Sequence, residues 1–298
     1  MVRYAVAENA SFYLGVVTYV AAMVLFFAQV VRRGAAPIAP REGGPTPPRS
    51  STAPALLAIG GAAHFVYILL ASVVARVCPV ESIHFALSVA SLVAIAAYMV
   101  GRLRWRIDAI GAAVAPIALT FLLATRIVGL GDVGQRLPPL FLTLHVGVNL
   151  IGDALFLLAS LAAVAYLVVE KRLKEKRFRS IAGRLPPLDA LDQAEHRFLL
   201  IGFPLLTIGI ITGTAWAHRL EVGHAGEVLR ATFAYATWLV FAAVLLLRSA
   251  AGWRGRRAAV GTIAGFVFAV LVLLVYLVRP APTPVSGELS HPNTEHPS

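Results

Sequence analysis

Long apolar runs separated by short polar segments form the main pattern along this chain. We count eight of them, at 11–31, 53–75, 83–100, 109–125, 140–169, 198–217, 231–247 and 258–278. A helix needs about 20 mostly apolar residues to cross a bilayer, and these runs are close to that length or longer. They keep no polar face, as a surface helix would, and they do not alternate as barrel strands do. The pattern therefore predicts an all-α, polytopic transmembrane helical bundle with about eight spans.

Composition agrees with the pattern of runs. Hydrophobic residues make up 58% of the 298 residues and charged residues only 14%, whereas an ordinary soluble domain is about 25% charged. This excludes a soluble globular protein and a disordered chain. A single cysteine, Cys78, excludes a disulfide scaffold.

The net charge of +11 is distributed unevenly between alternate loops. Of the 26 Lys and Arg residues, 19 fall in the loops 32–52, 101–108, 170–197 and 248–257. The positive-inside rule places these loops in the cytoplasm and both termini outside. Basic residues beside spans indicate topology and contact with anionic membrane lipid, so we expect no nucleic-acid partner.

The segments around the runs predict how the chain is divided. We expect a first transmembrane anchor at 1–31, a flexible cytoplasmic linker at 32–52, a seven-span membrane domain at 53–279 and a disordered outer tail at 280–298. The basic cluster at 171–179 is expected to prolong the fifth helix into the cytoplasm. Segment 180–197, which contains Pro186 and Pro187, is then expected to be a turn leading to the sixth span.

Ionisable side chains within or next to spans are costly and are therefore candidate site residues. Seven of the eight histidines fall in a span or on the predicted outer side. Neutral imidazole is a good ligand for haem iron, zinc and copper, and outer arginines suit haem propionates. The candidates are His64, His145, His218, His224 and His291, with Arg126, Arg136 and Arg230.

Asp153 lies in the fifth run, eight residues after His145, so the two face broadly the same side of one helix. It is a candidate proton-relay or substrate group. Alternatively, it has a structural role, paired with a span histidine or hydrogen-bonded to a neighbour such as Asn149. Each histidine likewise has the alternative of a hydrogen-bonded packing residue or a solvated one.

Several segments carry a resemblance to a known family. Residues 198–216 read FLLIGFPLLTIGIITGTAW, 237–241 read TWLVF and 252–259 read GWRGRRAA; upstream lie VESIHFALSVASL at 80–92, residues 106–118 and the histidine-bearing segment 142–168. In order, spacing and topology they resemble the cytochrome c assembly membrane proteins, closest to their HemX-like branch. The resemblance covers roughly residues 60–280.

The resemblance implies haem presentation at the outer face, with two outer histidines on the iron and a tryptophan-rich segment against the macrocycle. By position, His145 resembles the outer histidine of the fifth span, His64 a histidine within an early span, and His291 the histidine after the last span. The sequence departs from the family after Trp216, because residues 217–229 contain no large aromatic ring. His218 or His224 would then supply the second ligand.

Three functions follow as hypotheses. The first is a haem-binding or haem-presenting assembly factor of the bacterial cytoplasmic membrane, which works with apocytochrome and other cytochrome c assembly proteins. The second is a HemX-like regulatory or scaffold membrane protein that contacts its partner through segment 170–197. The third is a small-solute transporter that uses Asp153 and His64. We expect no enzyme, because no paired carboxylates, nucleophile–base arrangement or metal triad stands out.

Overall fold

The fold is a bundle of membrane-length helices. The computed structural model describes residues 2–35, 51–75, 83–105, 107–128, 139–174, 187–219 and 225–277. These ranges form α1 (Val2–Ala35), α2 (Thr52–Ala75), α3 (Ile83–Arg104), the 3-10 turn η2 (Asp108–Ile110), α4 (Gly111–Val128), α5 (Pro139–Lys174), α6 (Leu188–Arg219), α7 (Ala225–Ala251) and α8 (Arg256–Leu277). Eight of these helices are long and apolar enough to cross a membrane, which confirms the all-α fold and the span count.

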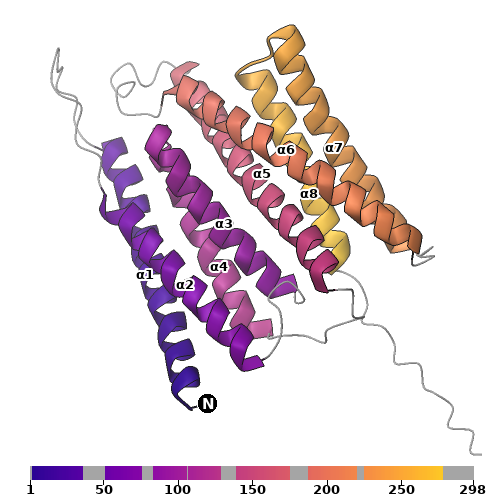
Figure 1. Cartoon of the computed structure of the whole chain (residues 1–298). Coiled ribbons are helices and arrows are strands. Elements are labelled where there is room, and N and C mark those ends of the chain that lie inside the picture. Colours follow the sequence, from indigo (N-terminus) through magenta and orange to yellow (C-terminus); the bar gives the residue numbers. More distant parts are fainter. Residues whose placement is uncertain are drawn as a thin grey trace, which may run out of the picture.

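The helices pack as two groups of four (Figure 1). In the first group α1 lies against α2 and α4, and α3 packs on α4; in the second α5 lies between α6 and α8, and α7 packs on α8. The two groups join mainly where α3 contacts α5. Successive helices run in opposite directions, so the start of α1 and the end of α8 lie at the same end of the bundle.

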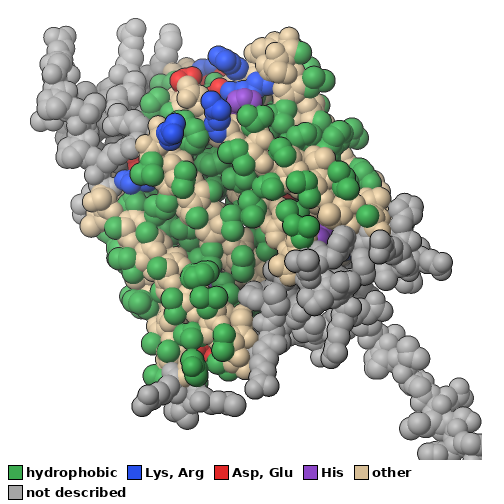
Figure 2. Space-filling model, viewed as in Figure 1, with side chains coloured by type: hydrophobic (Ala, Val, Ile, Leu, Met, Phe, Trp, Pro, Cys, Tyr) green, Lys and Arg blue, Asp and Glu red, His purple; other side chains and the backbone are tan. Residues whose placement is uncertain are grey.

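Basic side chains gather at the other end of the bundle (Figure 2). Apolar side chains cover the middle of the face seen there, as expected of a surface in contact with lipid. We call this basic end the arginine-rich end; its described basic residues are Arg102, Arg104, Lys171, Arg172, Lys174, Arg197, Arg248, Arg254, Arg256 and Arg257. These residues flank helix ends on the loops that the positive-inside rule assigns to the cytoplasm.

Helix α6 begins ten residues earlier than the sequence indicated. The expected turn at 180–197 was wrong for residues 188–197, which are helical. Pro187 caps the helix, because its carbonyl accepts the N–H of Leu191 at 3.2 Å. Leu191, Ala194 and Phe198 follow at helical spacing and are buried. Asp192 and Glu195 in this first part of α6 have partners on α7 and α8, as described below.

Helix α1 is part of the core. Tyr19 and Ala22 are fully buried and Phe26 almost so, and the ring of Phe26 lies 6.5 Å from that of Tyr98 on α3. Gly60 on α2 has no side chain to keep α1 away, and a Cβ there would collide with the ring of Tyr19. The first helix therefore packs into the bundle by close contact.

Candidate functional site

His145 lies near the start of α5, at the end of the bundle opposite the arginine-rich end, and its side chain is half-buried. Its Nδ1 is 2.8 Å from Oγ1 of Thr212 on α6. The Thr212 hydroxyl also lies 2.8 Å from the carbonyl of Ile208, to which it donates its single proton. With that proton directed to Ile208, Thr212 is placed to accept from Nδ1–H of His145. The other ring nitrogen, Nε2, has only a long contact of 3.4 Å with the side-chain nitrogen of Asn149.

Two glycines of α6 make room for this arrangement. A Cβ added to Gly213 would lie 3.1 Å from Cε1 of His145, and one added to Gly209 would overlap the side chain of Asn149. Asn149, one turn after His145, donates to the His145 carbonyl at 2.7 Å. The close approach of α5 and α6 thus sets the position of the imidazole ring.

Arg230 on α7 is the second predicted site residue that the structure brings to this place. Its side chain is half-buried and lies near the start of α7, at the same end of the bundle as His145. An imidazole and a guanidinium at one end of the bundle form a combination that suits an iron ligand and a carboxylate partner. Trp216 and His218 fall within α6, but their side chains lie outside the described part, as do residues Arg136, His224 and His291.

His64 occupies a different kind of position. It is fully buried, and both of its ring nitrogens are hydrogen-bonded. Nδ1 pairs with the hydroxyl of Tyr19 on α1 at 3.1 Å, and Nε2 with Oγ of Ser88 on α3 at 2.5 Å. With neither nitrogen free, His64 connects three helices and presents no lone pair to a ligand in this conformation.

Arg126 is also engaged elsewhere. Its guanidinium forms an ion pair with Glu8 at 3.1 Å, donates to Asn9 and lies over the ring of Phe12 at 5.5 Å. These contacts join the end of α4 to the start of α1. Arg126 therefore lies in the first group of helices, whereas His145 lies in the second.

Asp153 is exposed in the middle of α5. Among the described residues it has no hydrogen-bond or ion-pair partner, and Asn149 bonds to the backbone of His145 instead. Eight residues along a helix leave His145 and Asp153 about 80° apart around its axis, and only His145 contacts α6 through a hydrogen bond.

Comparison with known proteins gives the family. The model of the family described as "Cytochrome C assembly protein" matches residues 55–280. The chain belongs to this family. The match begins in α2, so it leaves out α1, although α1 supplies the Tyr19 partner of His64.

Individual relatives from this family match over shorter lengths. The "Cytochrome c biogenesis protein CcsA" of Guillardia theta is 34% identical over 190 residues, which is 56% of this chain and 62% of that protein. The protein of the same name from Synechocystis sp. (strain ATCC 27184 / PCC 6803 / Kazusa) is 39% identical over 110 residues, covering 37% of this chain and 32% of the relative. The chain thus spans less than two thirds of the length of these relatives. They give no support to the HemX-like branch, and neither the scaffold nor the transporter hypothesis is favoured by them. No solved structure matches.

The structure shows side-chain interactions that the sequence did not indicate. Thr212 was one of several threonines in the sixth run, and nothing in its local sequence marked it as the partner of His145. Asp192 falls in the segment expected to be a turn, yet it forms a bidentate ion pair with Arg248 of α7. Glu195 is almost fully buried and accepts from Thr262 of α8 at 2.7 Å. The helical spacing of apolar residues through 188–198 is the sequence feature that indicates a helix in this segment.

Proposed function

We propose that this protein is an integral membrane haem-handling factor in cytochrome c assembly, with haem as its cargo. The observation that carries the proposal is the hydrogen bond between His145 Nδ1 and Thr212, which holds the imidazole so that Nε2 could form the axial bond to iron. Histidines that bind metals commonly donate their other ring N–H to a neighbouring oxygen, as His145 does to Thr212. Membership of the cytochrome c assembly family supports the same function.

The described residues fit one side of a haem site. In this proposal His145 supplies an axial ligand and Arg230 pairs with a propionate. The second ligand would come from His218, His224 or His291. Trp216, two residues before His218 in the sequence, would supply an aromatic ring next to the haem. His64 and Arg126 are proposed to hold α1 in place rather than to contact haem, because their polar atoms are already engaged.

The distribution of charge supports an orientation for this site. If the arginine-rich end faces the cytoplasm, as the positive-inside rule predicts, His145 and Arg230 lie at the outer side of the membrane. We propose that membrane to be the bacterial cytoplasmic membrane. Haem would then be presented on the side where apocytochrome receives it, together with other assembly proteins. In this scheme the chain has no catalytic turnover of its own.

A haem titration tests the proposal. The full chain, purified in detergent, is titrated with haem, and the Soret band is recorded for the wild type and for His145→Gln. We expect a saturable band in the wild type that is lost or shifted by several nanometres in His145→Gln. His196→Gln is the matched control, because this histidine lies in the same second group of helices but at the arginine-rich end. An identical spectrum and affinity for wild type and His145→Gln would overturn the assignment.

A further inference from the structure

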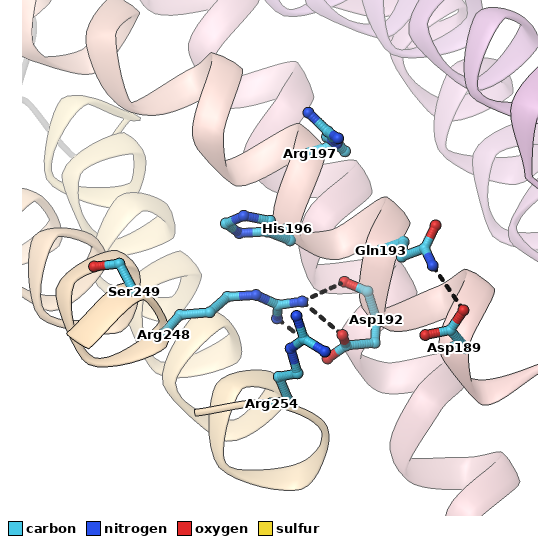
Figure 3. A pocket seen from close by; sticks show the side chains of 8 residues that line it. All are labelled: Asp189, Asp192, Gln193, His196, Arg197, Arg248, Ser249 and Arg254. Atoms are coloured by element: carbon cyan, nitrogen blue, oxygen red, sulfur yellow. Dashed lines mark hydrogen bonds and ion pairs between the residues drawn. The ribbon is translucent and has the colours of Figure 1, made fainter. Parts of the chain in front are cut away.

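A pocket of about 450 Å³ opens at the arginine-rich end of the second group of helices (Figure 3). Its walls come from the first turns of α6, the last turn of α7 and the turn between α7 and α8. The charged and titratable residues that line it are Asp189, Asp192, His196, Arg197, Arg248 and Arg254. None of these residues belongs to the site around His145, which lies at the opposite end of the bundle.

One wall of the pocket is rigid and neutral overall. The carboxylate of Asp192 accepts from both terminal nitrogens of Arg248, at 3.1 and 2.5 Å, and from the backbone N–H of Gly255 at 2.8 Å. Gly255 and Gly252 have φ of 64° and 66°, so the turn between α7 and α8 adopts a backbone conformation that favours glycine. Arg254 is carried by this fixed turn.

The remaining charges leave the pocket positive. Arg197 and Arg254 are both exposed, and neither has an ion-pair or hydrogen-bond partner among the described residues. Asp189 accepts from the side-chain amide of Gln193 at 2.6 Å. Because Asp192 and Arg248 cancel, two guanidinium groups and one carboxylate remain among the charged side chains of the pocket. The pocket therefore has a net charge of about one positive unit with His196 neutral.

Apolar side chains lie directly below the pocket on the membrane side. Leu200 and Ile201 stand one turn after His196 and Arg197 on α6, and Leu246 stands one turn before Ser249, which also lines the pocket, on α7. They are 45%, 57% and 65% exposed. A ligand with a charged group in the pocket would thus have an apolar surface against which to extend.

From this geometry we infer that the pocket binds a phosphate ester, namely the phosphodiester headgroup of an anionic phospholipid such as phosphatidylglycerol. A phosphodiester carries a single negative charge, which matches the pocket. Arg197 and Arg254 present planar guanidinium groups that bind phosphate oxygens in pairs. The acyl chains run past Leu200, Ile201 and Leu246 into the bilayer. This site is independent of haem binding.

Lipid binding to the full chain tests the inference. The protein is delipidated in detergent, and binding of phosphatidylglycerol and of phosphatidylcholine is measured by native mass spectrometry. The wild type is expected to bind one phosphatidylglycerol in preference to phosphatidylcholine. Arg197→Gln combined with Arg254→Gln is expected to weaken that binding at least about tenfold more than the control does, since both phosphate contacts are lost.

The control variant removes two positive charges from the arginine-rich end, as the pocket variant does. Arg104→Gln combined with Arg172→Gln alters two exposed arginines that do not line the pocket. All variants are checked for helix content by circular dichroism. Equal binding by the pocket variant and the control would overturn the site. A wild type without preference for phosphatidylglycerol, or one from which millimolar inorganic phosphate displaces the lipid completely, would overturn the assignment to a lipid.

Discussion

Replacing Thr212 by valine tests how the structure prepares His145. Valine has nearly the shape of threonine but no hydroxyl, so it removes the acceptor of Nδ1–H and little else. The lost bond is 2.8 Å long and half-buried. An unsatisfied donor in such a place costs about 1–3 kcal/mol. Substituting the partner of a metal-bound histidine typically lowers affinity about 10–100-fold, or about 1.4–2.7 kcal/mol, and the two estimates agree.

The assay is a titration of the detergent-purified protein with haem, read from the Soret band. Thr212→Val should bind haem about 10–100-fold more weakly than the wild type, whereas Thr212→Ser keeps the hydroxyl and should bind nearly as well. Thr207→Val is the matched control, because Thr207 on the same helix accepts a hydrogen bond from Trp238 at 3.0 Å and not from a histidine. Wild-type affinity in Thr212→Val, or an equal loss in Thr207→Val, would refute the reasoning.

Two further predictions concern buried and exposed charges. Arg248→Met leaves Asp192, whose side chain is only 10% exposed, with the Gly255 N–H as its main remaining partner. We expect the free energy of unfolding in mixed SDS micelles to fall by about 3–5 kcal/mol. Adding Asp192→Asn should recover part of this loss. A fall in the free energy of unfolding of less than about 1 kcal/mol would show that the Asp192–Arg248 ion pair contributes little to stability. Asp153→Asn should change the unfolding free energy by less than about 0.5 kcal/mol or raise it, because no described partner is lost and a charge in the middle of a span is costly. A decrease of more than about 1 kcal/mol in the free energy of unfolding, measured in the same titration, would contradict this prediction and show that Asp153 has a stabilising partner.

The fold was largely predictable from the sequence, because eight apolar runs and alternating basic loops are properties of single segments. The start of α6 was not, since the acids at 192 and 195 look like loop residues until their partners Arg248 and Thr262 are known. Those partners lie more than 50 residues away, and their pairing depends on how α6, α7 and α8 pack.

The candidate site was likewise predictable from the sequence only in part. Position along the chain was enough to select His145 and Arg230 as outer candidates. It did not separate them from His64, because burial and the two bonds to Tyr19 and Ser88 arise only when three helices meet. Nor did it identify Thr212, because the turn of α6 that faces His145 is set by the packing of Gly209 and Gly213 against α5.

The bonds of His64 also tie the first three helices to one another. A fragment that begins with the family match at residue 55 would keep His64 and Ser88 but lack Tyr19. Its imidazole would face the bilayer with one unsatisfied nitrogen, and the groove at Gly60 would lose the ring that fills it. We therefore expect insertion of the first three helices to be coupled, because the polar ring on α2 is fully satisfied only after α1 and α3 have both joined it. For expression of this protein, we expect a fragment that begins after α1 to be less stable than the full chain.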